Sequence, residues 1–492
     1  MQQLNIRKKT IVFWLSKPVP VTFFISLLLS IVAALGAVTI GRDAAFYLDV
    51  ALTYEEAGWQ AAYARFNWPW YSILLGGLHK ITSLPLIPLA YAINALFLAG
   101  TCSLLVKLVQ DHFPEAACWA SLVVLAVPAF NDYRDDIWRE YGFWFFCVLA
   151  LYTTASWSAR GGWWRILTIY AAIFLAALFR LEALFLVAAI GSWQAFSIRD
   201  RLSFHNAAQL VLIPVGIIAA CISFLLVLLD EANLSRLIIY LKLLNPLGIF
   251  DSLGVLADGI AASMKAGYSR NQAGEIAFFG IIGAVLYEFV KSLGVFVIPF
   301  LARWSTPRPA LLNPTLTVFG HAFVLYFLVL VVFFFQQHFT TGRYNSFLAM
   351  LAVPLTAIVC LDFAKRFPRL SKVMIALALI SMLSNVVSLS PGRTHYREAA
   401  DWIKLNIAAD SQVYFMDRRI AFYAGREVEA RVPAETQAIS TLIDSFDYFV
   451  LELPADHPEL VLFLEDKQVS VEKVFTNKDG KTVTVFSRGR NN

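Results

Sequence analysis

The residues best suited to chemistry are charged side chains that stand at the ends of long apolar stretches. The first is Asp43 in Gly41-Arg42-Asp43, directly after the first apolar stretch of the chain. A carboxylate at the water edge of a bilayer can accept the proton of a hydroxyl group. Asp43 is therefore the first candidate for a general base. The structural alternative is that it pairs with Arg42 or caps a following helix.

A second group of carboxylates lies in the polar segment 131–140, between two apolar stretches. It contains Asp132, Asp135, Asp136 and Glu140, together with two arginines. Such a segment is either a solvated loop or a place where a carboxylate orients an acceptor or binds a divalent cation. Asp49 lies shortly after Asp43, and the two need not share one face of a helix.

Three arginines are candidates for binding an anion, because the planar guanidinium donates two hydrogen bonds to one phosphate. Arg180 interrupts an apolar stretch together with Glu182, a pairing equally suited to an internal ion pair. Arg343 opens another apolar stretch, and its alternative role is to reach lipid headgroups. Arg270 lies in the long stretch 230–284. The residues beside Arg343 add polar groups to the same segment: His338 and Tyr344.

The composition requires a membrane environment for these residues. Of the 492 residues, 59% are hydrophobic and 15% are charged, and apolar runs recur at about the 20-residue length that spans a bilayer. The net charge of +5 is spread in short clusters between apolar runs, which is typical of topology signals and does not indicate nucleic-acid binding. The five cysteines lie in or beside apolar runs, so no disulfide framework is predicted.

We predict a polytopic α-helical membrane protein with about eleven transmembrane helices. Their expected ranges are 19–40, 86–105, 116–130, 141–157, 167–178, 183–196, 208–228, 285–301, 316–335, 344–361 and 373–389. The segment 68–84 contains Pro69, His79 and Lys80, and we expect it to form an interfacial helix on the outer side.

The basic clusters predict the orientation, since Lys and Arg are enriched in cytoplasmic loops. Arg7, Lys8 and Lys9 hold the N-terminus in the cytoplasm, and the later clusters fall on the same inner side. An odd number of spans then places the C-terminus outside. The outer side receives the loops 41–84, 131–140 and 230–284, which contain the candidate residues.

The pattern changes at Pro391 to that of an α/β domain. We expect a membrane domain at 1–390 and an outer α/β domain at 391–492. The latter has expected helices at 395–408, 418–425 and 434–444, strands at 412–416 and 448–453, and a hairpin turn at 477–480. It has no Gly-x-Gly-x-x-Gly loop, so nothing indicates a nucleotide site there.

These features together resemble the GT-C superfamily of integral-membrane glycosyltransferases, in particular bacterial relatives of protein O-mannosyltransferases and of lipid A aminoarabinose transferases. The resemblance covers nearly the whole chain. The matching segments are GRDAAFYLDVA around Asp43, EEAGWQAAYARFNWPWYSILLGGLHKI, the loop 132–140, GRYNSFLAMLAVPL from Gly342, and REAADWIKLNIAADSQVYFMD in the tail. Two departures stand out: Ala44 follows Asp43 where an acid is frequent, and Trp68-Pro69-Trp70 replaces a double-proline motif.

The resemblance implies a glycosyltransferase that takes a sugar from a polyprenyl-phosphate donor and works at the outer face of a bacterial inner membrane. It implies a carboxylate base and arginines that stabilise the departing lipid phosphate. The candidate residues are, for catalysis, Asp43, Asp135 and Asp136; for the donor phosphate, Arg343, Arg180 and Arg270; and for the acceptor or sugar, Asp49, Asp132, Tyr344 and His338.

Other functions stay open at this point. A transporter or lipid flippase would also be polytopic, although no internal repeat is visible. A glycan polymerase or ligase would use a longer lipid-linked chain as donor. The sugar and the acceptor, whether a glycan, a lipid or a protein, are not specified by the sequence. The cofactor also stays open, with a divalent metal as an alternative for which no ligand motif is seen.

Overall fold

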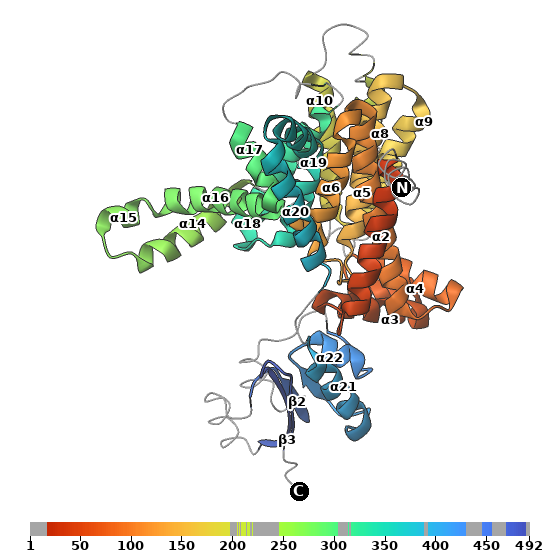
Figure 1. The fold of residues 1–492 in the computed structure, drawn as a ribbon. Coiled ribbons are helices and arrows are strands. Elements are labelled where there is room, and N and C mark those ends of the chain that lie inside the picture. The colour runs from red at the N-terminus through yellow and green to blue at the C-terminus, as the bar shows by residue number, and fades with distance from the viewer. Residues whose placement is uncertain are drawn as a thin grey trace. The chain divides into compact units, whose positions relative to one another are not determined.

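The structure is a computed structural model, shown as a ribbon in Figure 1. It describes residues 17–196, 246–303, 316–387, 392–429, 445–454 and 469–488, with residues 204, 206, 208–212, 214–216, 219 and 313. The predicted helix at 434–444, most of the predicted span at 208–228 and the first part of the stretch 230–284 lie outside the described residues.

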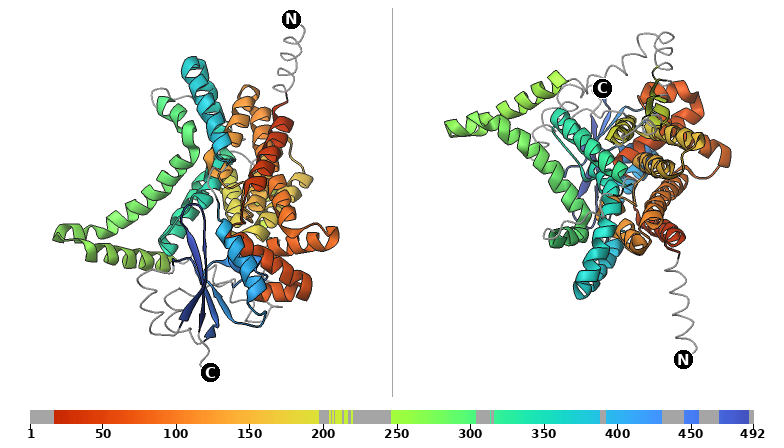
Figure 2. Two further views of the ribbon diagram at one scale, coloured as in Figure 1. Left: turned by 60° about the horizontal axis from the view of Figure 1, so that its bottom comes forward. Right: turned by 90° about the horizontal axis from the view of Figure 1, so that it is seen from above.

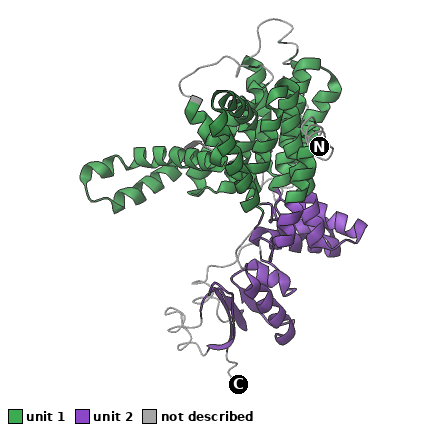
Figure 3. Cartoon of the chain, viewed as in Figure 1, with its two compact units in different colours: residues 1–29, 95–133, 140–386 green, residues 30–94, 134–139, 387–492 purple. Residues whose placement is uncertain are grey.

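The chain forms two compact units, which Figure 3 shows in different colours. Unit 1 comprises residues 1–29, 95–133 and 140–386, and unit 2 comprises residues 30–94, 134–139 and 387–492. The units are made of interleaved segments of the chain. Unit 2 therefore joins parts of the predicted outer loops 41–84 and 131–140 with the C-terminal region.

Six helical stretches among the described residues are long and apolar enough to cross a membrane, in agreement with a polytopic helical protein. Their bounds are α2 (Pro18–Gly36), α5 (Leu86–His112), α8 (Glu140–Arg160), α18 (Thr317–Gln337), α19 (Gly342–Arg366) and the stretch Ala273–Ala302, which includes α16 (Ala273–Leu293), η4 (Gly294–Val297) and most of α17 (Ile298–Arg303). All six overlap predicted spans.

Shorter apolar helices occupy most of the remaining predicted spans. They are η1 (Pro114–Ala116), α6 (Ala117–Ala126), α7 (Pro128–Asn131), α9 (Trp163–Phe179), η2 (Leu181–Leu184), α10 (Phe185–Phe196) and α20 (Pro368–Ser384). The predicted span at 116–130 is interrupted at Val127, which has extended backbone (φ −64°, ψ 130°). The cause is Pro128, because proline disfavours helical backbone in the residue before it.

The stretch 246–293, expected to be in part an outer loop, is largely helical. It contains α14 (Pro246–Ser263), α15 (Gly267–Asn271) and α16, which begins twelve residues before the predicted span at 285. Residues 273–284 are apolar apart from Glu275, which lies in the first turn of α16. Figures 1 and 2 show that α14 and α16 extend outward from the other helices of unit 1 and are joined at their outer end through α15.

The described C-terminal residues form the expected α/β arrangement. It consists of α21 (Thr394–Asn406), β1 (Val413–Phe415), α22 (Arg418–Tyr423), β2 (Tyr448–Leu451), β3 (Val469–Thr476) and β4 (Thr482–Arg488). The strands make one sheet in the order β1-β2-β4-β3, with β1 and β2 parallel and the other pairs antiparallel. Ala399, Ala400 and Ile403 of α21 pack against Val450 and Val485 of the sheet.

The predicted outer segment 41–84 forms two helices, α3 (Arg42–Arg65) and α4 (Trp70–Thr82). α3 is broken at Gly58, whose backbone (φ 84°, ψ −177°) is accessible almost exclusively to glycine. α4 packs against α3, with Gly76 so close to the carbonyl of Ala51 that a Cβ on Gly76 would lie 2.5 Å from that oxygen. These helices form the part of unit 2 that carries Asp43.

Candidate functional site

Four charged side chains of unit 1 form what we call the arginine–glutamate cluster: Glu140, Arg180, Glu182 and Arg343. The Nη1 of Arg180 lies 2.7 Å from Oε1 of Glu140, and its Nη2 lies 2.7 Å from Oε1 of Glu182. The Nε of Arg343 lies 3.3 Å from the same Oε1 of Glu140. Glu140 therefore bridges the two arginines.

Each member of the arginine–glutamate cluster stands where a helix begins or ends. Glu140 is the first residue of α8, and Arg343 is the second residue of α19. Arg180 lies between α9 and η2 in extended backbone (φ −148°, ψ 123°), where the helix stops. The interruption of the apolar sequence by Arg180-Leu181-Glu182 is thus also an interruption of the helix.

Burial explains why these charges are paired. The side chain of Glu140 is 2% exposed and that of Arg180 is 9% exposed. Isolated charges are costly in such surroundings and persist when opposite charges and hydrogen bonds compensate them. The Arg180–Glu182 pair, one of the two alternatives from the sequence, is present, and Glu140 is the additional partner that sequence reasoning did not assign to it.

The ring of Tyr344 lies near both guanidinium groups. Its centroid is 4.8 Å from the guanidinium carbon of Arg180 and 5.3 Å from that of Arg343, distances that suit cation–π attraction. The hydroxyl of Tyr326 donates a hydrogen bond to the carbonyl of Tyr344 at 3.1 Å. Tyr344, predicted to bind the sugar or acceptor, therefore packs against the two arginines of the arginine–glutamate cluster.

Of the two arginines, Arg343 is the better placed to receive an anion. Arg180 is closely paired with two carboxylates, whereas the side chain of Arg343 is 19% exposed and has the longer contact with Glu140. The hydroxyl of Tyr133 lies beside the start of α19, since a Cβ on Gly342 would be 2.6 Å from it. Burial raises the pKa of Tyr133, which keeps its hydroxyl protonated as a donor.

The other candidates of unit 1 lie elsewhere. Arg270 is exposed on α15, the helix at the far end of the α14–α16 hairpin (Figure 1). His338 ends α18, with its Nε2 3.3 Å from the carbonyl of Ser252 on α14. Asp132 is exposed. The structure thus brings Arg180, Arg343 and Tyr344 together.

In unit 2, Asp43 is the second residue of α3 and is partly exposed. The carboxylate of Asp136 lies against the backbone just before it, because a Cβ on Gly41 would be 2.0 Å from Oδ1 of Asp136. The same Oδ1 accepts a hydrogen bond from the amide of Ile137 at 2.8 Å. Two candidate carboxylates from distant parts of the sequence thus meet at the start of α3. We call Gly41, Asp43 and Asp136 the Asp43 site.

Asp135 is exposed, and its backbone carbonyl accepts a hydrogen bond from the hydroxyl of Tyr91 at 2.9 Å. That contact holds the segment 134–139 within unit 2. A second contact does the same, because Arg134 donates to the hydroxyl of Ser30 at 2.7 Å.

Asp49, predicted to bind the acceptor or sugar, is engaged in a structural contact. Its Oδ2 lies 2.7 Å from Nη2 of Arg65 and 3.4 Å from the amide of Val428. Burial raises the pKa of Asp49, and the adjacent Arg65 opposes that effect. Asp49 therefore links α3 to the C-terminal region.

The C-terminal region also reaches the first turn of α3, which sequence reasoning did not predict. Arg42 donates to the carbonyl of Met416 at 2.7 Å and lies 3.6 Å from Oδ2 of Asp417. The guanidinium carbon of Arg418 is 5.2 Å from the ring centroid of Phe46. The available sequence signal was a basic residue at the start of each helix, Arg42 in α3 and Arg418 in α22. That signal does not identify partners that lie far apart in the sequence.

Within the part of the chain that the structure describes, no three His, Cys, Asp or Glu side chains are grouped closely enough to hold a metal ion. The carboxylate segment 131–140 is instead divided, with Glu140 in the arginine–glutamate cluster and Asp136 in the Asp43 site.

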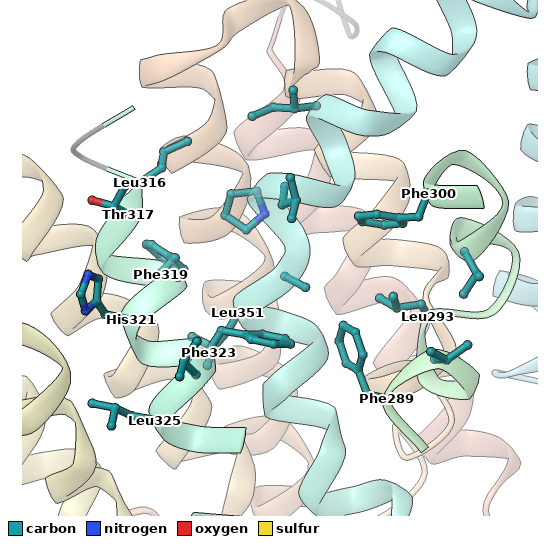
Figure 4. A pocket seen from close by; sticks show the side chains of 18 of the residues that line it. Phe289, Leu293, Phe300, Leu316, Thr317, Phe319, His321, Phe323, Leu325 and Leu351 are labelled. Atoms are coloured by element: carbon teal, nitrogen blue, oxygen red, sulfur yellow. The ribbon is translucent and has the colours of Figure 1, made fainter. Parts of the chain in front are cut away.

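An apolar cavity of about 1030 Å³ lies in unit 1 between α10, α16, α17, α18 and α19 (Figure 4). Phe289, Phe319, Phe323 and Leu351 are among its lining residues. His321 is one of its few polar members, with Nδ1 3.1 Å from the hydroxyl of Ser192. Its apolar lining suits a hydrocarbon chain.

No protein-family model and no curated protein sequence matches the chain. Among the solved structures that match is the crystal structure of ArnT from Cupriavidus metallidurans bound to undecaprenyl phosphate. The match covers 96% of this chain and 98% of that chain, with 12% identity and a TM-score of 0.42.

Proposed function

We propose that the protein is a membrane glycosyltransferase that moves a sugar from a polyprenyl-phosphate donor to a hydroxyl group of a glycan, lipid or protein. The observation that carries this proposal is the layout of α19. The helix begins with Arg343 in the arginine–glutamate cluster and lines the apolar cavity with Leu351, Leu355 and Ile358.

The distance along α19 between Arg343 and the residues that line the cavity suits a lipid with a phosphate headgroup. At about 1.5 Å per residue, the cavity-lining positions lie roughly 12–22 Å along the helix from Arg343. An amphiphile with a phosphate at Arg343 could therefore place its hydrocarbon chain in the cavity. Arg343 would supply a charge-assisted contact, and the first turn of α19 adds the positive end of a helix dipole.

In the proposed reaction, the oxygen of an acceptor hydroxyl forms a bond to the anomeric carbon of the sugar. The bond between that carbon and the phosphate oxygen breaks, and the electron pair leaves with the polyprenyl phosphate. Arg343 stabilises the charge on the departing phosphate. A carboxylate takes the proton of the hydroxyl, and the sequence resemblance makes Asp43 the candidate for this role. The role of Asp43 rests on its place at the start of α3 and on the sequence resemblance of its segment.

The contacts within unit 2 support a shared side of the membrane for the Asp43 segment and the C-terminal region. Arg42 contacts Met416, and Arg65 donates to the carbonyl of Val428 at 2.8 Å. The chain must then cross the membrane an even number of times between these segments. With the inner basic clusters, we propose that both face the periplasm and that the N-terminus is cytoplasmic.

Lipid-linked sugar profiling of a deletion strain tests the function. A glycosyltransferase of this kind would leave its donor unused, so one polyprenyl-phosphate monosaccharide should accumulate in the deletion strain and disappear on complementation. Accumulation of a long lipid-linked glycan would indicate a polymerase or ligase instead. An unchanged lipid profile would contradict the proposal and leave transport as the function to test.

A further inference from the structure

The first turn of α3, which carries Asp43, is in contact with residues 416–418 of the C-terminal region. Arg42 donates to the carbonyl of Met416 at 2.7 Å and lies 3.6 Å from Asp417. Asp417 is itself held by Arg419, with Nε 2.7 Å from Oδ1 and Nη2 2.6 Å from Oδ2. The anchoring of this segment is therefore provided by Arg42, Asp417 and Arg419.

Arg418 stands between these anchors and faces α3. Its guanidinium carbon is 5.2 Å from the ring centroid of Phe46, which lies one turn after Asp43 on the same helix. Burial lowers the pKa of Arg418, and the carboxylate of Asp43 is the main charge that opposes this effect. The half-buried guanidinium of Arg418 thus lies over the start of the helix that carries Asp43.

Arg418 also lines a small cavity of about 40 Å³ in unit 2, together with Tyr414, Phe415 and Glu427. A space of this size holds a few water-sized groups, since one water needs roughly 10–15 Å³ on this measure. Arg418 thus borders a solvent-sized space in addition to its contact with Phe46 of α3.

We infer that Arg418 is a positioning residue for Asp43, so that the C-terminal region completes the Asp43 site. Arg418 orients the Asp43 carboxylate at the start of α3, while its neighbours hold the segment in place. The catalytic consequence rests on the proposed function, and the pairing of the two side chains does not.

Several other charged or titratable groups surround this pair and belong to the same electrostatic environment. They are Arg42 and Tyr47 on α3, Asp136 beside Gly41, Asp417 before α22, and Glu427 and Glu429 at the small cavity. A test must therefore isolate the interaction of Arg418 with Asp43 from single-charge effects.

A double-mutant cycle does this without any substrate. The wild-type protein, Asp43→Asn, Arg418→Gln and the double variant are compared at full length in nanodiscs by thermal unfolding. If the side chains interact, the unfolding midpoint of the double variant falls by less than the sum of the two single-variant decreases, with a difference of roughly 2 °C or more. Additive losses would overturn the inference.

Arg426 provides the matched control. It lies in the same region and donates to backbone carbonyls of that region, those of Ile407 at 3.2 Å and Ala408 at 2.6 Å among them. Arg426→Gln removes the same charge and should destabilise the protein. In the double variant of Arg426→Gln and Asp43→Asn, the decreases in the unfolding midpoint should be additive.

The positioning role is read from kinetics. The release of undecaprenyl phosphate from a set of undecaprenyl-phosphate hexoses and pentoses is measured, which detects transfer to any acceptor, water included. Arg418→Gln should lower kcat by about ten- to a hundredfold with KM changed little, because misplacing a catalytic group costs rate. Arg418→Lys should recover part of kcat.

The two measurements separate the inference from the proposed function. If the wild-type protein releases no undecaprenyl phosphate from any donor, the proposed function fails while the cycle still decides the pairing. A coupled cycle with wild-type kcat in Arg418→Gln would overturn the positioning role.

Discussion

Arg65 and Asp49 belong to the same helix, α3, and form a salt bridge with 2.7 Å between Nη2 and Oδ2. In a straight helix their positions would be about 24 Å apart. The break at Gly58 turns the chain so that the end of α3 returns toward its middle. Val428 then joins the pair through its amide and carbonyl, which fixes the C-terminal region to this fold of the helix.

We expect Asp49→Asn to lower stability and to leave the catalytic groups intact. The side chain of Asp49 is 13% exposed and that of Arg65 is 20% exposed, so the loss of one partner leaves a largely buried charge. The expected cost is roughly 1–3 kcal/mol. Thermal unfolding measures it, with Glu56→Gln on the exposed face of α3 as control. Equal midpoints for Asp49→Asn and the wild type would contradict this role.

Asp43→Asn should lower turnover strongly. It preserves the size of the side chain and removes the proton acceptor, so turnover should fall by roughly a hundredfold or more while donor binding changes little. Release of undecaprenyl phosphate from the donor set reports turnover. A purified variant with near-normal transfer would transfer the base role to Asp135 or Asp136.

Arg343→Ala should weaken the binding of undecaprenyl phosphate. Loss of a charge-assisted contact to phosphate costs roughly 1.5–3 kcal/mol, which is about ten- to a hundredfold in affinity. Binding to the protein in nanodiscs measures this. Arg270→Ala removes an equal charge from the exposed α15 and should leave the affinity unchanged. Equal losses in both variants would mean a general charge effect.

The C-terminal region should lose stability in mild acid through His395. Burial lowers the pKa of His395 below its usual value of 6.5, so below that pH the unfolded chain binds a proton that the folded chain does not. Stability therefore falls as the pH drops from 6.5 toward the folded-state pKa, by at most about 1.4 kcal/mol per pH unit. The nearby Glu452 and Glu398 oppose the effect, and Arg393 and Lys481 add to it. Thermal unfolding of His395→Gln between pH 5 and 7 should show a smaller pH dependence; an identical dependence would exclude this histidine as its source.

The even number of crossings predicts a labelling pattern in intact cells. In a cysteine-free background, Glu56→Cys and Lys404→Cys, both at exposed positions, should react with a membrane-impermeant maleimide. Lys365→Cys should be protected, since Lys365 belongs to a basic cluster that the charge pattern predicts to be cytoplasmic and pairs with Glu115 at 2.6 Å. Labelling of position 56 without position 404 would contradict the shared side.

The apolar helices were the part of the fold that the sequence predicted best. The span expected at 141–157 is α8 (Glu140–Arg160), and that at 344–361 is α19 (Gly342–Arg366), because an unbroken apolar run bounded by charges permits few alternatives. The start of α16 was missed, although residues 273–284 are apolar apart from Glu275 and continue directly into the predicted span at 285. In the C-terminal region, period-two patterning located β2, and the turn residues at 477–480 located the β3–β4 hairpin.

The candidate site was predicted by residue type and not by partner. Arg180 stood out as a charge within apolar sequence, and the adjacent Glu182 is indeed bound to it. Glu140 could not be assigned to Arg180, because that contact depends on how α8 packs against α9. Likewise, Asp49 gave no sign that its partner would be Arg65 across a break in the helix. Contacts of this kind follow from tertiary packing, which local patterns do not encode.

The interleaving of unit 2 sets an order of events during synthesis. Residues 30–94 leave the ribosome long before residues 387–492 have been translated, yet both belong to one compact unit. Until translation ends, Arg42 lacks Met416 and Arg65 lacks Val428. The segment that carries Asp43 is thus among the first to be made and among the last to mature, so a nascent or prematurely terminated chain carries this carboxylate without its native surroundings.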